Sequence, residues 1–265
     1  MSFQPVIPFG GTAGWAFLQR TKDAQQAAFA KSPVIQRDAD YFRENIGKID
    51  SARELVDDYR LMKVALGAFG LDDDLPNKAY IEKVLSEGSL APDAFANKLV
   101  DKRYLALTQA FNFDLGTPSS KLSDFADKIL ASYEERQFEI AVGNQNPSMR
   151  VSLALERDLS AVVEGENSND GRWYAVMGNP PLRQVFEKAL GLPASFGTID
   201  LDLQMKGFRD RTQTVFGVSE VKDFGDPKMM DELNRMYLVR SQIDEFASVQ
   251  SAAWIALTLL QNMGR

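Results

Sequence analysis

The sequence predicts an all-α protein, and three observations support this prediction. Helix N-caps recur along the chain, because an Asn or Asp stands directly before a proline at Asn146, Asn179 and Asp226. Apolar residues recur at spacings of three and four, which is the period of a helix with one buried face. No run of β-branched and aromatic residues alternates at period two between turn signals. We therefore expect an array of roughly nine or ten helices.

One helix is predicted to begin at a capping box formed by Ser51 and Glu54. The hydroxyl of the serine can accept a backbone N–H, while the carboxylate reaches back to the start of the helix. Gly70 is expected to end this helix in the left-handed conformation. The apolar residues between these signals follow a single stripe: Leu55, Tyr59, Met62, Leu66 and Phe69.

Two further long helices are predicted downstream, one opening at Pro92 and the other capped by Asn146. The segment Gln137–Val142 comes closest to a strand pattern, but it continues a helical stretch that starts at Asp124, so we interpret it as helix. The stripes of the two long helices are Ala96, Val100, Tyr104, Leu107 and Phe111, and Val151, Leu155, Leu159 and Val162.

A polar, glycine-bearing segment from Glu164 to Gly171 is the best candidate for a boundary inside the chain. It predicts an N-terminal helical half over residues 1–165 and a C-terminal helical half over residues 166–265, which can also pack as one domain. The two halves are faintly similar around residues 61–67 and 182–191. A diverged duplication and coincidence among helical sequences both account for this similarity.

The composition is that of a folded globular protein. Of 265 residues, 45% are hydrophobic and 25% are charged, and the formal net charge is −7. An acidic protein repels phosphate unless Lys and Arg gather on one face, and here basic residues alternate with acidic ones, as in Glu156-Arg157-Asp158. We therefore expect neither nucleic acid nor an anionic membrane as partner.

The chain contains no cysteine and no histidine. This excludes disulfides, thiolate nucleophiles and zinc-thiolate sites, and it removes the commonest general base and the commonest transition-metal ligand. We expect no catalytic residues, no cofactor and no bound metal, and a non-enzymatic protein. An enzyme that uses carboxylates alone, with or without Mg²⁺, is the alternative that this composition leaves open.

Three motifs suggest a ligand site, and each has a simpler interpretation. The triplet Asp72–Asp74 suits a hard cation, but it follows Gly70 and fits a solvated turn before the next helix. The segment Glu166–Gly171 resembles part of a calcium loop, yet its twelfth position is Met177 rather than an acid. Gly10–Gly14 has neither a preceding strand nor the lysine of a phosphate-binding loop.

Neither end of the chain predicts a membrane segment. Residues 1–20 have no basic region and are interrupted by proline and glycine, unlike a signal peptide. The most apolar stretch, residues 252–260, is far shorter than the ~20 residues that span a bilayer. We expect a soluble, cytoplasmic protein without membrane insertion.

Aromatic and large apolar residues near both ends are candidates for contacts with a protein partner or a second copy: Trp15, Phe17, Trp254 and Leu257. The predicted terminal helix, Val249–Met263, is apolar around much of its circumference. We therefore expect other helices to pack against more than one of its sides. We interpret it as an association helix anchored by Trp254. The simpler interpretation is that both terminal helices pack on the core.

Three stretches of the chain resemble a known family. They are residues 1–21, 58–113 and 178–204, of which ALGAFGLDDD and LVDKRY are the most distinctive parts. Together they resemble an uncharacterised alphaproteobacterial family whose genes tend to lie in flagellar gene clusters. The resemblance implies a helical, non-enzymatic protein that acts with a flagellar component, either in the cytoplasm or after export through the flagellar apparatus. It assigns no site residues.

Overall fold

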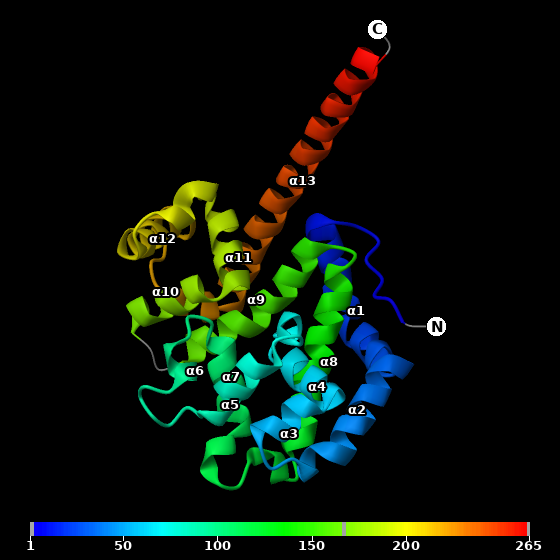
Figure 1. The fold of residues 1–265 in the computed structure, drawn as a ribbon. Helices are drawn as coiled ribbons and strands as arrows, with labels where there is room; N and C mark the ends of the chain where they lie inside the picture. Colours follow the sequence, from blue (N-terminus) through cyan, green and yellow to red (C-terminus); the bar gives the residue numbers. More distant parts are fainter. Residues whose placement is uncertain (1–2, 166–167, 264–265) are drawn as a thin grey trace. The chain divides into compact units, whose positions relative to one another are not determined.

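The structure, a computed structural model, describes the backbone of residues 3–165 and 168–263 and the side chains of these ranges up to residue 247. This part of the chain contains thirteen α-helices, joined by turns and short 3₁₀ helices, and it contains no β-strand. Figure 1 shows the helices as coiled ribbons. The all-α prediction is confirmed, and helix accounts for well over half of the chain. The 3₁₀ helices are Ile46–Lys48, Asp72–Asp74, Phe113–Leu115, Ser119–Lys121, Ala194–Thr198 and Val221–Gly225.

The chain divides into two compact units, each made of two pieces of sequence. The first unit comprises the residues up to Val6 and Arg20–Asn144, and the second comprises Ile7–Gln19 and the described residues from Gln145 onward. Helix α1 (Gly11–Ala30) therefore contributes its first half to the second unit and its second half to the first. This division differs from the predicted boundary at residue 165.

The first unit is an array of helices around α4 and α8. Helix α4 packs against α8 and α2, and α3 packs against α5. Besides the second half of α1, its helices are α2 (Pro33–Asn45), α3 (Ala52–Asp57), α4 (Tyr59–Ala68), α5 (Lys78–Ser86), α6 (Phe95–Lys98), α7 (Lys102–Phe111) and α8 (Phe125–Gly143).

A glycine sets how closely α4 and α8 approach each other. A Cβ at Gly67 would lie 2.9 Å from the ring of Tyr133, which is fully buried on α8. The Tyr133 hydroxyl donates a hydrogen bond to Asp38 on α2 (3.1 Å), and Lys63 on α4 donates to the same carboxylate (2.7 Å). One buried acid thus links three helices of the first unit. Burial, followed by the nearby Asp38, raises the pKa of Tyr133, so its hydroxyl remains protonated and keeps donating.

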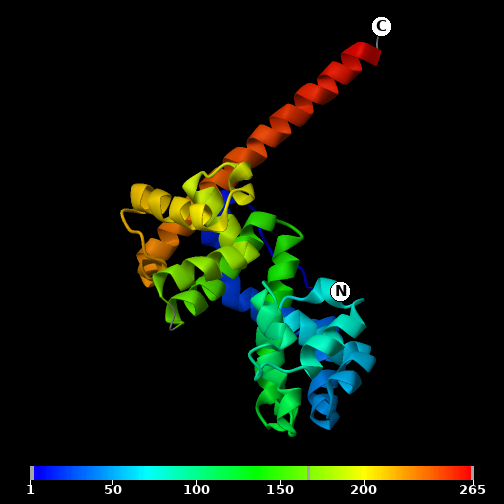
Figure 2. The same cartoon turned by 60° about the vertical axis from the view of Figure 1, so that its left-hand side comes forward.

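The second unit is built around α11, which packs against α9, α10, α12 and α13. Its core is a cluster of aromatic rings in edge and stacked contacts, which comprises Trp173, Phe186, Phe196, Phe208, Phe216 and Phe224. Its helices, besides the first half of α1, are α9 (Pro147–Glu164), α10 (Asn169–Gly178), α11 (Pro180–Leu190), α12 (Leu201–Phe216) and α13 (Pro227–Met263). Figure 2 shows α13, from orange to red, as one continuous helix.

The predicted caps are present where the sequence places them. Ser51 accepts a hydrogen bond from the backbone of Glu54 (3.3 Å), and the Glu54 carboxylate accepts one in return from the backbone of Asp50 (2.8 Å). Asn179 caps α11 by accepting from the backbone N–H of Leu182 (3.1 Å). Gly70 has a φ of +70°, as expected of the left-handed residue that ends a helix.

The helices are shorter and more numerous than predicted. The stripe after Ser51 is split because Asp58, in an extended conformation, ends α3 and caps α4 by accepting from two backbone N–H groups. As a result Tyr59, predicted to be buried, is exposed. The long helix predicted from Pro92 is likewise split into α6 and α7, with Asp101 capping α7. Val100 lies in this break and is 82% exposed, so its predicted place in the buried stripe is wrong.

Replacing Asn146 with alanine is expected to lower the free energy of unfolding by about 1 kcal/mol. The Asn146 side chain accepts a hydrogen bond from the backbone N–H of Met149 (3.1 Å) at the start of α9, and alanine would leave that donor without a partner. Urea unfolding followed by circular dichroism measures the change. Asn144→Ala is the matched control, because Asn144 is exposed two residues earlier, where it ends α8 through its backbone N–H and does not cap the start of α9. Equal effects of the two substitutions would contradict the cap.

Candidate functional site

Helix α13 of the second unit carries an exposed apolar surface. This surface lies just after the last buried residue of the helix. Helix α13 is anchored by Leu233, Tyr237 and Leu238, which are buried, and its last buried residue within the described side chains is Ser241. Every residue of 243–247 is exposed. Because successive helical residues point about 100° apart, five consecutive exposed residues mean that every side of this turn is partly open to solvent.

Two of these exposed residues are large and apolar. Ile243 is 60% exposed and Phe246 is 63% exposed. They are three positions apart, so they lie next to each other on one side of the helix. A lone exposed apolar residue is ordinary, but an adjacent isoleucine and phenylalanine, both exposed, make a surface suited to contact with another protein.

Polar contacts from the same unit hold the base of this turn in place. Lys188 on α11 forms an ion pair with Asp244 (2.7 Å), and the Ser148 hydroxyl at the start of α9 donates to Glu245 (3.0 Å). Burial raises the pKa of the phenol of Tyr237, about two turns before Glu245 on α13, and the Glu245 carboxylate raises it further. The acidic residues of the turn thus point to their own unit, while its apolar residues are left exposed.

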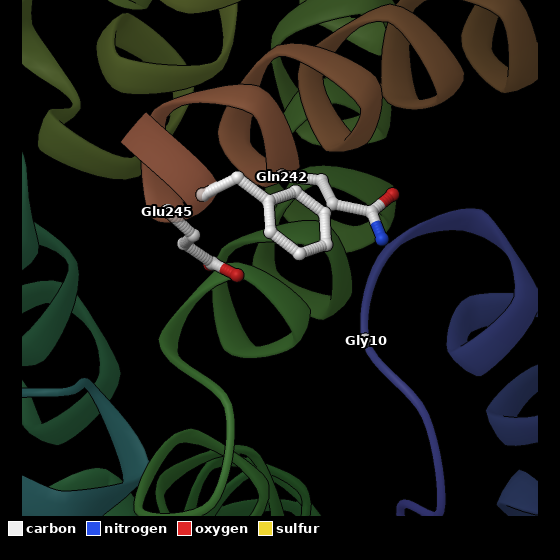
Figure 3. Close-up of a pocket in the computed structure, with 4 residues that line it drawn as sticks. Gly10, Gln242 and Glu245 are labelled. Carbon is white, nitrogen blue, oxygen red and sulfur yellow. The ribbon is translucent and has the colours of Figure 1, made fainter. Parts of the chain in front are cut away.

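A shallow pocket of about 290 Å³ opens beside this turn. It is lined by Gly10, Gln242, Glu245 and Phe246, and Figure 3 shows the Gln242 side chain extending toward the segment that carries Gly10, with Glu245 on the same helix. Glu245 is the one ionisable residue among these four, so the lining offers no pair of carboxylates for acid–base catalysis. An apolar group of a partner can fill such a pocket against the ring of Phe246.

The glycines at the start of α1 have a packing role that their sequence did not indicate. Gly11 has a φ of +61°, and a Cβ at this position would overlap the side-chain amide of Gln242. Glycine therefore allows the N-terminal segment to approach α13 closely at the pocket. The sequence suggested only a flexible segment before the first helix, because the partner of this contact lies far away in the chain.

The residues predicted to contact a partner have different positions. Trp15 is 7% exposed, so it lies in the core of this chain, and its contact with a partner stays a prediction. Phe17 is half-buried. The side chains of Trp254 and Leu257 lie outside the described residues. Ile243 and Phe246, which the structure exposes, were not selected from the sequence. Two apolar residues three positions apart are common in helices and do not indicate whether they are buried or exposed.

Two of the three aspartates of the Asp72–Asp74 turn accept side-chain hydrogen bonds. Asp72 accepts from the Gln137 amide (2.7 Å), and Asp74 accepts from the Tyr104 hydroxyl (2.6 Å). Burial and this bond raise the pKa of Tyr104. The contacts agree with the turn interpretation. Throughout the described residues, no group of three or more carboxylates is arranged to hold a metal ion.

The described part of the segment that resembles a calcium loop, residues 168–171, has a structural role. Ser168 caps α10 by accepting from the backbone of Gly171 (3.1 Å), and Asp170 forms an ion pair with Arg209 (2.9 Å). Glu166 lies outside the described residues. The two described polar residues therefore stabilise the start of α10.

Residues 68–230 match the family described as "Protein of unknown function (DUF1217)". The chain belongs to this family. No curated protein is significantly similar in sequence. The fold of the DUF1217 chain is similar to that of an X-ray crystal structure of a protein from Agrobacterium tumefaciens, with a TM-score of 0.69 and 24% identity over 88% of this chain and 97% of the other. At this identity the similarity establishes the fold.

The DUF1217 match runs from the last residue of α4 to the start of α13. The pocket residues Gly10, Gln242, Glu245 and Phe246 lie outside it, so the candidate surface belongs to the flanks of the DUF1217 region. None of the helices searched in the described part of the chain is both long and apolar enough to cross a membrane.

Proposed function

We propose that this chain is a non-enzymatic helical binding protein that contacts another protein through the exposed part of α13. The observation that carries the proposal is the exposure of Ile243 and Phe246 side by side, at the rim of a pocket with an apolar wall. Exposed aromatic and large aliphatic side chains next to a pocket are typical of the centre of a protein interface. Membership of the DUF1217 family is compatible with this function, but the family description itself assigns no function.

The contacts of the acidic residues support binding rather than carboxylate chemistry. In the Asp72–Asp74 turn, the most concentrated acidic motif of the sequence, Asp72 accepts a hydrogen bond from Gln137 and Asp74 accepts one from Tyr104. Asp38, the buried acid of the first unit, is neutralised by Lys63. A general acid or base needs a carboxyl group free to exchange a proton with substrate, and these groups are engaged in holding helices together.

We further propose that the partner is a flagellar component and that the encounter takes place in the cytoplasm. This part of the proposal rests on the sequence resemblance to a family whose genes tend to lie in flagellar clusters. The predicted contacts Trp254 and Leu257 follow Phe246 on the same helix, and they stay predictions because their side chains lie outside the described residues. Export through the flagellar apparatus would bring the same surface to a partner outside the cell.

We expect Phe246→Asp to abolish the capture of a flagellar component from extracts of a flagellated host. A charge at this position would need to be desolvated in the interface, while the isolated chain tolerates it because Phe246 is exposed. Pull-down followed by mass spectrometry measures the loss, with and without the genes that neighbour this one. Val100→Asp is the control, since Val100 is even more exposed but lies in the first unit. Capture of the same flagellar component by both variants would refute the proposed function.

A further inference from the structure

An exposed apolar surface of the second unit lies where the chain enters α12. Every residue from Gly197 to Leu203 is exposed, and three of them are large and apolar. Ile199 is 42% exposed, Leu201 50% and Leu203 57%. Side chains that keep about half of their surface in water add little to the core, so the folding of this chain does not account for them. Such a concentration of exposed aliphatic residues indicates contact with another molecule.

A tyrosine from a neighbouring helix extends this surface. Tyr174 on α10 is 38% exposed, and its hydroxyl donates a hydrogen bond to Asp202 in the first turn of α12 (2.8 Å). Asp202 stands between Leu201 and Leu203 in the sequence, so this bond holds the tyrosine beside the exposed leucines. Figure 1 shows α10 and α12 as neighbours in the second unit. The four residues Tyr174, Ile199, Leu201 and Leu203 are called the α12 patch below.

Two carboxylates lie among the residues of the α12 patch. Asp200 caps α12 by accepting from the backbone N–H groups of Asp202 (2.9 Å) and Leu203 (3.4 Å), while Asp202 accepts from the tyrosine. Neither aspartate forms an ion pair with a Lys or Arg in the described part of the chain. The patch therefore combines exposed apolar side chains with two negative charges that no such pair neutralises.

The local field at the α12 patch is negative. The next two basic residues of α12 form ion pairs with other acids, namely Lys206 with Asp210 (2.6 Å) and Arg209 with Asp170 (2.9 Å). The hydrogen bond to Asp202, above all, raises the pKa of the Tyr174 phenol, and burial and the charges of Asp170 and Asp200 raise it further. A cation brought to this surface would therefore be attracted by more than one carboxylate.

These features select a basic protein segment as the partner. Its large apolar residues would cover the aliphatic side chains of the patch, and its Lys or Arg would meet Asp200 and Asp202. The same carboxylates repel nucleic acid and anionic membranes. A second copy of this chain is disfavoured as well, because two α12 patches would bring their aspartates together. The exposed surface at Phe246 is no better match, since it directly follows Asp244 and Glu245.

We propose that the α12 patch binds a segment of another protein in which large apolar residues stand among Lys and Arg. The patch lies inside residues 68–230, the part of the chain that matches the DUF1217 family, whereas the α13 surface lies outside it. The inference adds a second binding surface and does not depend on the proposed function, because no residue of α13 takes part. Four side chains make a small contact, so we expect a Kd on the order of tens of micromolar.

The first test uses two synthetic peptides of about 14 residues that differ only in charge. Both place leucines on one helical face, and the remaining positions are lysine in one peptide and glutamate in the other. Fluorescence anisotropy of the labelled peptides measures binding to the purified full chain up to about 200 µM. We expect the lysine peptide to bind and the glutamate peptide not to bind. No binding of the lysine peptide, or equal binding of the two, would overturn the proposal.

The second test locates the lysine peptide on the chain. Leu203→Ser removes an exposed apolar side chain and is expected to weaken binding about tenfold. Asp202→Asn removes a charge but keeps an acceptor for the tyrosine, and it is expected to weaken binding about threefold at low salt. The matched controls Leu90→Ser and Asp73→Asn change exposed residues of the first unit and are expected to bind like the unchanged chain. Equal effects in test and control variants would overturn the proposal.

Phe246→Asp separates this inference from the proposed function. It is expected to leave binding of the lysine peptide unchanged, because α13 is not part of the patch. If it weakens peptide binding as much as Leu203→Ser does, the peptide lies at α13 and the inference is wrong. If Phe246→Asp leaves both peptide binding and capture of the flagellar component intact, the proposed function fails and the α12 patch stands.

Discussion

Replacing Trp173 with alanine is expected to lower the free energy of unfolding of the second unit by about 3–5 kcal/mol. Trp173 is fully buried, and its ring stacks on Phe208 (centroids 5.7 Å apart) and contacts Phe186 edge to face (5.4 Å). Its indole N–H donates to the backbone carbonyl of Ser219 (3.1 Å). Alanine would leave a cavity in the aromatic cluster and an unpaired carbonyl beside it.

The neighbouring residue provides the control for this experiment. Tyr174 is partly exposed and donates its hydroxyl to Asp202 at the surface (2.8 Å), so Tyr174→Ala is expected to cost less than about 1 kcal/mol. Urea unfolding monitored by circular dichroism gives both values under identical conditions. Shifts of the same size for Trp173→Ala and Tyr174→Ala would show that the aromatic cluster does not hold the second unit together.

Replacing Asp38 with alanine is expected to destabilise the first unit by about 2–3 kcal/mol. The fully buried Tyr133 hydroxyl would lose its acceptor, and Lys63 and Arg60 would lose the carboxylate that lies 2.7 Å and 3.8 Å from them. The cost stays below that of a wholly buried ion pair because both cations keep contact with solvent.

Asp40→Ala is the matched control for Asp38→Ala. Asp40 lies on the same helix, but its side chain is 72% exposed and it pairs only with the exposed Arg43 (3.8 Å). We expect a change within about 0.5 kcal/mol, as for most surface substitutions. Tyr133→Phe provides a further check, because it removes the hydroxyl but keeps the ring. If Asp38→Ala costs no more than Asp40→Ala, the buried acid does not connect α2, α4 and α8 energetically.

The sequence predicted the features of the fold that are determined locally. A cap needs only a side chain and an N–H group three residues away, so Asn146, Asn179 and Ser51 could be recognised without knowledge of the rest of the chain. The breaks at Asp58 and Val100 were missed because the apolar spacing continues across them. Aspartate inside a helical pattern is compatible with either continuation or a new cap, and tertiary packing decides between them.

The candidate site was less predictable because it depends on contacts between distant segments. The need for glycine at position 11 arises from Gln242, and Phe246 is exposed just after α13 passes the start of α9 and the end of α11, which contact Glu245 and Asp244. Trp15 illustrates the reverse case. It was selected as an aromatic residue near a terminus, but burial is a property of the folded chain that neither residue type nor position determines.

The assignment of Ile7–Gln19 to the second unit has a consequence for synthesis of the protein. On the ribosome, Arg20–Asn144 of the first unit is complete before any residue after Asn144 has been made, so this unit can fold early. The segment before it must wait, because its packing partners from Gln145 onward emerge last. During that interval the first turns of α1, including Trp15, are apolar and uncovered. The nascent chain thus presents a transient hydrophobic segment, the kind on which chaperones act, until the residues after Asn144 have been made.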